Sequence, residues 1–304
     1  MSRVARHSPT AYTADARVLS IIEELTVSLR FAGITDPRRI ATDIIAALLE
    51  VPRSWPTMNR ESAVDAQIIS SAREAARRLN AGAPFAYAVG SAQFRHLNLQ
   101  VDSRVLIPRP ETEVLVGEIL ERMDARFKSG ESWGLAVDIG TGSGAIALCL
   151  ASEGNFEQVI ATDVSLDALD VASSNAMRCG PALKCGVEFR RGSLIAPVRD
   201  VKATVLVSNP PYIAFSELDA LPASVRDWEP PLALISGHDG MAATAKIITD
   251  GTRILLSGGI LALEVDERRA SLVAELIMRH GGYTDVGVRL DLAGRERFVL
   301  ASRI

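Results

Sequence analysis

The first candidate for chemistry is a glycine-rich turn between an apolar strand and a helix. Gly140, Gly142 and Gly144 alternate with Thr141 and Ser143, directly after the apolar run 135–139. Glycines in such a turn let the backbone approach a ligand closely and point free N–H groups at it. The turn therefore predicts a binding site for a nucleotide-like cofactor.

Two carboxylates flank this turn. Asp163 ends the next apolar run, where a carboxylate can accept hydrogen bonds from a ribose diol. Asp138 lies at the tip of the first strand, where it would repel a pyrophosphate but could hold a positively charged amino-acid group. The alternating glycines also resemble motif I of the class I methyltransferases. These features favour S-adenosylmethionine as the cofactor; a dinucleotide and a simple tight turn are the alternatives.

The second candidate is Asn209, which is followed by Pro210, Pro211 and Tyr212 at the end of the apolar run 203–207. Two consecutive prolines cannot continue a central strand, because neither donates a ladder hydrogen bond. The strand must stop there and leave Asn209 at its carboxyl edge, where ligands bind in open α/β sheets. The alternative is a rigid strand exit in which Tyr212 only packs.

Apolar periodicity predicts the elements that precede these motifs. Helical stripes predict a small all-α domain over residues 15–90, after a disordered tail over 1–14. Alternation over 94–101, a turn at Asp102 and a return strand over 105–107 predict a β-hairpin linker within 91–110.

Residues 111–304 are predicted to form the catalytic domain. Short apolar runs alternate there with helical patterns, which predicts an α/β fold with a seven-stranded, mostly parallel sheet covered on both faces. The last two strands are expected to form an antiparallel pair at the end of the sheet. The predicted strands are 135–139, 158–162, 187–190, 203–207, 259–264, 283–288 and 297–301, and the predicted helices are 145–152, 166–178, 241–256 and 267–280, with a further helix after residue 113.

Charge is distributed unevenly along the chain. The net charge of the 304 residues is −4, yet residues 1–110 hold 14 arginines, no lysines and 10 acidic residues, a balance of +4 that leaves −8 for the remainder. The basic part is either a solvated helical face or a surface that meets an acidic partner or RNA.

Composition predicts a cytoplasmic protein without a metal site. The three cysteines and four histidines show no metal-ligand spacing, and this cysteine usage suits a reducing compartment. The N-terminus has no apolar signal segment, and no run approaches 18 apolar residues, so no membrane span is expected.

Four segments together resemble the release factor glutamine methyltransferase family, the HemK/PrmC group. The Asn-Pro-Pro-Tyr sequence at Asn209 is similar to a motif of methyltransferases that modify the adenine amine or the glutamine amide. Segments 81–94, 106–113 and 228–240 resemble the family's other signatures, in the family's order, and the likeness covers about residues 20–302. It implies a class I methyltransferase (Rossmann-like) fold with an N-terminal substrate-docking domain.

The resemblance implies a clamp for a planar nitrogen. The Asn209 side-chain oxygen and the Pro210 carbonyl would accept the two N–H bonds of the target, and Tyr212 would pack against its plane. The implied catalytic residues are Asn209, Pro210, Pro211 and Tyr212; the implied cofactor-binding residues are Asp138, Gly140, Thr141, Gly142, Ser143, Gly144, Asp163 and Asn209; the implied substrate-binding residues are Arg109, Pro110, Glu111 and Thr112. For Arg109 and Glu111, an interdomain ion pair is the alternative.

The implied reaction is N5-methylation of the glutamine in the Gly-Gly-Gln motif of peptide chain release factors, by a monomer that docks this protein partner. Glutamine methylation of a ribosomal protein, N6-adenine methylation and a non-catalytic binding module are the alternatives. Direct nucleic-acid binding is not expected, because the catalytic part carries the negative balance. The sequence departs from the family pattern at Gln93, Ser193 and Leu194, and after Glu264, where His-Gly is common.

Overall fold

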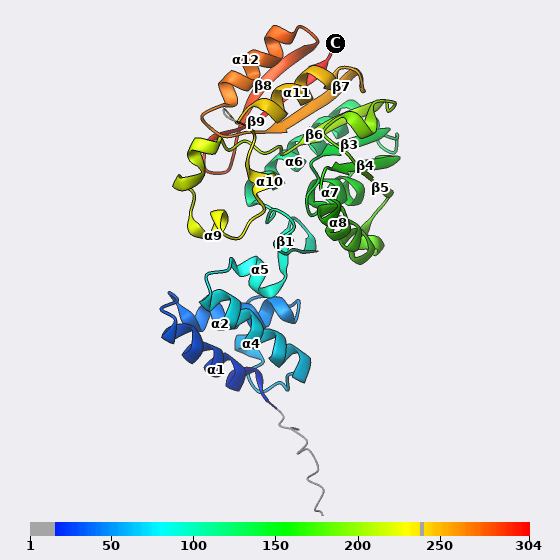
Figure 1. Cartoon of the computed structure of the whole chain (residues 1–304). Helices are drawn as coiled ribbons and strands as arrows, with labels where there is room; N and C mark the ends of the chain where they lie inside the picture. Colours follow the sequence, from blue (N-terminus) through cyan, green and yellow to red (C-terminus); the bar gives the residue numbers. More distant parts are fainter. Residues whose placement is uncertain (1–15, 238–239) are drawn as a thin grey trace, which may run out of the picture. The chain divides into compact units, whose positions relative to one another are not determined.

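The computed structural model describes residues 16–237 and 240–304, which divide between Val89 and Gly90 into two compact units (Figure 1). The tail predicted over 1–14 lies outside the described residues, as do His238 and Asp239.

The first unit is all helical, as its apolar stripes predict. Pro37 opens the second helix, and the Asp65 side chain caps the fourth by accepting a hydrogen bond from the Gln67 N–H at 2.7 Å. Leu25 and Ile44 are among the residues of its buried core. The helices are α1 (Val18–Phe31), α2 (Pro37–Leu48), α3 (Trp55–Met58), α4 (Ala66–Asn80) and α5 (Phe85–Val89).

The second unit is built on a seven-stranded sheet in the order β5-β4-β3-β6-β7-β9-β8. All neighbours from β5 to β7 are parallel, and β9 is antiparallel to both β7 and β8. The predicted mostly parallel sheet and the antiparallel pair at its end are therefore confirmed. The strands are β3 (Leu135–Ile139), β4 (Gln158–Asp163), β5 (Gly186–Arg191), β6 (Ala203–Ser208), β7 (Leu255–Glu264), β8 (Tyr283–Leu290) and β9 (Glu296–Arg303).

Helices cover both faces of this sheet (Figure 1). Side chains alternate along each strand, so that Val205 joins a core with α6 (Pro110–Arg126) and α7 (Ala145–Glu153), whereas Leu206 joins a core with α11 (Ala242–Gly251) and α12 (Ala270–His280). A fifth helix, α8 (Leu166–Cys179), contacts β4 and β5. The buried runs of the central strands reflect this double cover.

The chain reverses direction across the sheet at β3. It runs from β3 outward to β4 and β5, then returns to β6 on the other side of β3. The connection after β3 leads toward β4, whereas the connection after β6 leads toward β7. The two connections therefore diverge and open a crevice at the carboxyl ends of β3 and β6. The chain after β6 continues through three short helices: η3 (Phe215–Ala220), α9 (Ala223–Arg226) and α10 (Pro231–Leu234).

The predicted β-hairpin exists, but its strands were wrongly assigned. The strands are β1 (Ser91–Phe94) and β2 (Leu97–Gln100), and residues 105–107 form no strand. Arg95, with φ of 51°, begins the tight turn inside the strand predicted over 94–101. The three-residue step between the buried Phe94 and Leu97 breaks the two-residue period and marks this turn.

The helix predicted over 241–256 ends at Gly251 instead. A Cβ at Gly251 would lie 2.8 Å from a Leu206 methyl and 2.9 Å from the Tyr283 hydroxyl, so a larger residue there would require these side chains to shift. Leu255 continues the helical period, but it pairs with Ala203 as the first residue of β7. A buried residue at a strand start and one at a helix end have the same apolar signature.

Asn175 of α8 joins three parts of the second unit. Its side chain accepts from the Gln100 N–H at 2.7 Å, and donates to the carbonyl oxygens of Gln100 and Ser143 at 3.0 and 2.9 Å. The side chain is fully buried. One amide thus fastens the hairpin and the glycine-rich turn to α8, a role that no sequence pattern indicated.

We expect Asn175→Ala to lower the free energy of unfolding by about 2–3 kcal/mol, because it leaves buried backbone groups without partners. Urea unfolding of the whole chain measures the change. Asn155→Ala, which removes an exposed amide that donates to the Glu131 carbonyl, is the control and should change stability by less than about 0.5 kcal/mol. Equal losses in the two variants would contradict this assignment.

Candidate active site

The glycine-rich turn follows β3 and lines a cavity of about 450 Å³ at the carboxyl edge of the sheet. Gly140, Gly142 and Gly144 have φ of 74°, 55° and 85°, in the left-handed region that favours glycine. Gly140 and Gly142 line the cavity, whereas a Cβ at Gly144 would press on Leu148 and Ala172. The first two glycines thus expose backbone to a ligand, and the third allows close packing.

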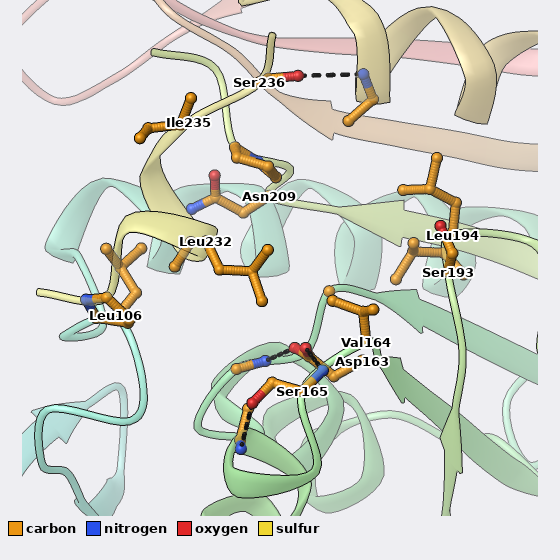
Figure 2. A pocket seen from close by; sticks show the side chains of 18 of the residues that line it. Leu106, Asp163, Val164, Ser165, Ser193, Leu194, Asn209, Leu232, Ile235 and Ser236 are labelled. Atoms are coloured by element: carbon orange, nitrogen blue, oxygen red, sulfur yellow. Dashed lines mark hydrogen bonds between the residues drawn. The ribbon is translucent and has the colours of Figure 1, made fainter. Parts of the chain in front are cut away.

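Asp163 ends β4 on the same cavity and organises the turn (Figure 2). Its Oδ2 accepts from the Gly142 N–H and its Oδ1 from the Ser165 N–H, both at 3.0 Å. A carboxylate has about four acceptor positions, so these two bonds leave capacity for two more. Asp163 can therefore accept the two hydroxyl hydrogens of a ribose diol.

Asp138 lies beneath the turn and is fully buried. Its Oδ2 accepts from the Thr141 hydroxyl at 2.6 Å, while its Oδ1 has no hydrogen-bond partner. Burial, partly opposed by the Thr141 hydroxyl and the backbone N–H of Ala147, raises the pKa of Asp138 to about 7. A cation or a water molecule bound beside Oδ1 would supply the missing partner and favour the carboxylate.

Asp138 does not line the cavity, and neither do three other residues of the predicted cofactor set. Thr141 and Ser143 are buried, and their atoms serve the turn itself: the Thr141 N–H donates to the Thr162 carbonyl, and the Ser143 carbonyl accepts from Asn175. Gly144 begins α7. The structure thus separates residues that face the cavity from residues that shape its wall.

Apolar side chains form much of the remaining wall (Figure 2). Leu106, Val164 and Leu194 contribute from three separate loops, and Leu232 and Ile235 from α10 and the residue after it. Ser193 also lines the cavity beside Leu194. A flat, mostly apolar ring such as a purine fits a wall of this kind. Leu232 and Ile235 were not predicted, since only a long connection after β6 brings them here.

Asn209 stands at the end of β6, as the two prolines predict. The Ser208 hydroxyl donates to the Ile139 carbonyl at 2.7 Å, which ties the end of β6 to the end of β3. Asn209 and Pro211 line the first cavity, whereas Pro210 is buried. Tyr212 faces a different space, and burial raises the pKa of its hydroxyl to about 12, so the phenol stays neutral.

That space is a second cavity of about 410 Å³, and Asn209 lines it too. Its wall carries apolar side chains and several charges that are paired with one another. Arg109 donates to Glu229 at 2.6 Å, and Arg268 contacts Asp266 at 2.7 Å. Arg297 is the other arginine of this wall. Asn209 therefore stands at the junction of a cavity beside the glycine turn and a cavity beside Tyr212.

The residues predicted to bind substrate lie at the start of α6, but their surroundings differ. Arg109 lines the second cavity, but its ion pair is with Glu229 of the same unit rather than with Glu111. Pro110 is exposed, and neither Pro110 nor Glu111 lines either cavity. Thr112 is buried and donates from its hydroxyl to Glu264 at 2.6 Å.

Sequence reasoning missed three charged residues of this site. Glu229 has only 1% of its side chain exposed, Glu264 is buried, and Arg297 lines the second cavity. Glu229 lies in a segment that carries the family resemblance, and Glu264 lies where the sequence departs from the family pattern, but neither had a predicted role. Glu264 could have been predicted, because an acidic residue at the carboxyl end of an apolar run lies at the edge of the sheet where ligands bind.

Within residues 16–237 and 240–304, no group of three His, Cys, Asp or Glu side chains is arranged to hold a metal ion. The three cysteines are free thiols. Over the same residues, no helix combines the length and the apolar character that crossing a membrane requires.

Comparison with known proteins identifies both units. Residues 20–90 match the PrmC N-terminal domain, and residues 116–221 match the methyltransferase small domain. A release factor glutamine methyltransferase of Rhodopirellula baltica is 36% identical over 93% of this chain and 95% of its own length. The enzyme of the same name from Nitratidesulfovibrio vulgaris is 36% identical over 96% and 97%. The chain belongs to the release factor glutamine methyltransferase family.

Solved structures agree on the fold of this family member. A methyltransferase from Pyrococcus furiosus superposes with a TM-score of 0.51 at 20% identity and covers 69% of this chain and 89% of its own. The hMettl16 catalytic domain gives a TM-score of 0.54 at 16% identity, with coverage of 85% and 91%. Together with the family membership, this fold makes the chain a class I methyltransferase, and its methyl donor is S-adenosylmethionine.

The first cavity fits this donor. Its volume suits a ligand of that size, and Asp163 has free acceptor positions for a ribose. Asp138 is fully buried and does not line this cavity, so it would act on the positively charged amino-acid group of the donor through its charge or through a water molecule. Arg104 and Lys246 line the cavity as well as Asp163, so the charges of the wall do not by themselves distinguish a sulfonium nucleoside from a dinucleotide. The family membership identifies the donor.

We expect Gly142→Ala to weaken S-adenosylmethionine binding by at least about tenfold, or 1.4 kcal/mol. Alanine is strained at a φ of 55°, and Gly142 lines the donor cavity. Gly130→Ala is the matched control. Gly130 has a φ of 82°, which imposes similar strain on an alanine, but it does not line either cavity. Calorimetric titration should separate the two variants, and equal donor affinities would refute the assignment of Gly142 to the donor cavity.

We expect Asp138→Asn to flatten the pH dependence of stability between about pH 4 and pH 7. The pKa of Asp138 is about 7 in the folded chain against an ordinary value of 3.8, so in this window the folded state holds a proton that the unfolded state has released. The free energy of unfolding therefore falls as the pH rises through the window. Urea unfolding at several pH values measures the slope, and an unchanged slope in the variant would rule out this burial effect.

Proposed function

We propose that this chain transfers the methyl group of S-adenosylmethionine to the side-chain amide nitrogen of the glutamine in the Gly-Gly-Gln motif of a peptide chain release factor. The relatives that match over nearly the whole chain carry the name of this reaction. The proposal includes the release factor as a protein partner, the helical unit as part of its docking surface, a monomeric enzyme and a cytoplasmic location.

The position of Asn209 between two cavities is the observation that carries the proposal. The first cavity has the glycine turn and Asp163, and suits the donor. The second, with Tyr212 and paired charges, is large enough for an extended polar side chain. A glutamine that enters through the second cavity would bring its amide to Asn209. The donor would then lie in the first cavity, on the other side of Asn209.

The chemistry required of the protein is orientation more than proton removal. An amide nitrogen is a poor nucleophile, because its lone pair is delocalised into the carbonyl. Two acceptors, the Asn209 Oδ1 and the Pro210 carbonyl, would hold both N–H bonds and leave the nitrogen facing the donor as the lone pair localises. S-adenosylmethionine supplies a methyl group that its sulfonium already activates.

A strong base is not needed for this transfer. The nitrogen acquires positive charge only as the new bond forms, so its proton becomes acidic late and can pass to an accepting oxygen or to water. Neither His96 nor His280, the histidines that the structure describes, lines either cavity. Tyr212, neutral and facing the second cavity, can pack against the flat amide.

We expect Asn209→Ala to lower the methylation rate by at least about 100-fold while donor affinity changes less than about threefold, because the clamp acts on the target nitrogen. The assay incubates the enzyme with labelled donor and purified release factors, ribosomal proteins or DNA, and peptide mass mapping locates the label. The wild-type enzyme should label one glutamine of the release factor, and Asn155→Ala should match it.

The same assay tests the alternatives. Label on a ribosomal protein would move the substrate to a different protein class, and label on DNA would make the target an adenine amine. Donor binding without label on any of the three would contradict an enzymatic role for Asn209.

A further inference from the structure

A buried chain of two hydrogen bonds leads away from Asn209. Its Nδ2 donates to the Thr112 hydroxyl at 3.4 Å, and this hydroxyl donates to the Glu264 Oε2 at 2.6 Å. Thr112 is 4% exposed and Glu264 is 2% exposed, so water does not compete for these bonds. The three residues come from the end of β6, the first turn of α6 and the end of β7.

The sheet register explains why these side chains meet. Ser208 pairs with Leu263, so that Asn209 and Glu264 are the next residues at the carboxyl edge of two parallel neighbours. Side chains alternate along β7, and Ala262 faces the core that contains α6. Glu264 therefore points to the same face, where Thr112 of α6 stands between it and Asn209.

An ionised Glu264 gives this chain one direction. A carboxylate only accepts hydrogen bonds, so the single Thr112 hydrogen must point to Glu264. The Thr112 oxygen can then only accept from Asn209, which fixes the amino end of the amide toward Thr112. The Asn209 Oδ1 is left facing away from Thr112, free to accept from a ligand.

This orientation decides whether Asn209 can hold a target amide. The oxygen and nitrogen of an asparagine side chain are nearly equal in size, so packing alone does not choose between the two orientations. The reversed orientation would present N–H groups to the N–H groups of the target. A donor facing a donor cannot form the clamp.

We propose that Glu264, acting through Thr112, is a positioning residue that holds the Asn209 amide with its oxygen toward the target nitrogen. This inference rests on the proposed function of Asn209. Neither Glu264 nor Thr112 lines either cavity, so neither acts on the substrate directly.

The surroundings of Glu264 make the device sensitive to pH. Burial raises the pKa of Glu264 to about 7, against the opposing effects of the Thr112 hydrogen bond and of Arg297 on β9. Glu111 and Arg109, at the start of α6, are the other charges that act on it, one raising and one lowering its pKa. Once protonated, Glu264 can donate to Thr112, whose hydrogen can then turn to Asn209 and permit the reversed amide.

Three variants test the proposal in the full-length enzyme, with labelled donor and release factor both saturating, and a fourth serves as the control. Thr112→Val removes the hydroxyl at constant volume, and Glu264→Gln removes the charge that sets the direction. Each should lower kcat at least about tenfold with donor affinity unchanged within about twofold. Thr112→Ser keeps the hydroxyl and should restore most of the rate.

The control is Thr204→Val, at the opposite end of β6. Thr204 is also buried and donates to the Trp133 carbonyl at 2.5 Å, so this variant removes a similar hydrogen bond far from Asn209. It should lose stability but keep kcat. Calorimetry with S-adenosylmethionine verifies that each variant is folded.

The pH profile separates positioning from a purely structural role. In the wild type, kcat should fall as the pH drops through about 7, where Glu264 gains its proton. In Glu264→Gln, kcat should be low at every pH and should not show this fall. If Thr112→Val and Glu264→Gln kept the wild-type rate while Asn209→Ala was inactive, this proposal would be overturned and the proposed function would stand. A wild-type enzyme that labels no glutamine would overturn the proposed function and this inference with it.

Discussion

The active site depends on the parallel pairing of β3 with β6. Parallel strands end at the same edge of a sheet, and the Ser208 hydroxyl, bound to the Ile139 carbonyl, fixes the two ends together. The glycine turn leaves one strand end and Asn209 leaves the other. Since the chain departs from them in opposite directions across the sheet, the crevice that opens there is bounded by both motifs. In the proposed reaction, donor and target meet at this point.

Buried polar groups are concentrated around this edge. Asp138, Asn175, Thr112 and Glu264 are all nearly inaccessible, and most of their polar atoms are hydrogen-bonded to other elements of the same unit. Burying such groups is costly unless their partners are in place, so each bond demands accurate positions of the elements that it joins. The apolar cores on the two faces of the sheet provide the stability, whereas these polar contacts determine the geometry of the site.

The distribution of charge matches a reaction that needs orientation. On the donor side, Asp163 lines the cavity, and Asp138 is buried beneath the glycine turn, where burial raises its pKa to about 7. On the other side, arginines and carboxylates are paired with one another, as Arg109 is with Glu229. Such a wall can hold a neutral, polar side chain without presenting it with an uncompensated charge.

Local chemistry determined much of this protein from the sequence alone. The prolines after Asn209 and the glycines after Ile139 allow few backbone conformations, so the strand ends and the turn could be predicted, and alternating apolar periods predicted the sheet. The hairpin strands were wrong because the turn at Arg95 was missed, and the end of α11 was wrong because a buried apolar residue looks alike in a strand and in a helix. Only the tertiary structure placed Glu264, Glu229 and Asn175. Each forms a hydrogen bond with a residue more than 70 positions away in the sequence, and such a contact exists only in the folded chain.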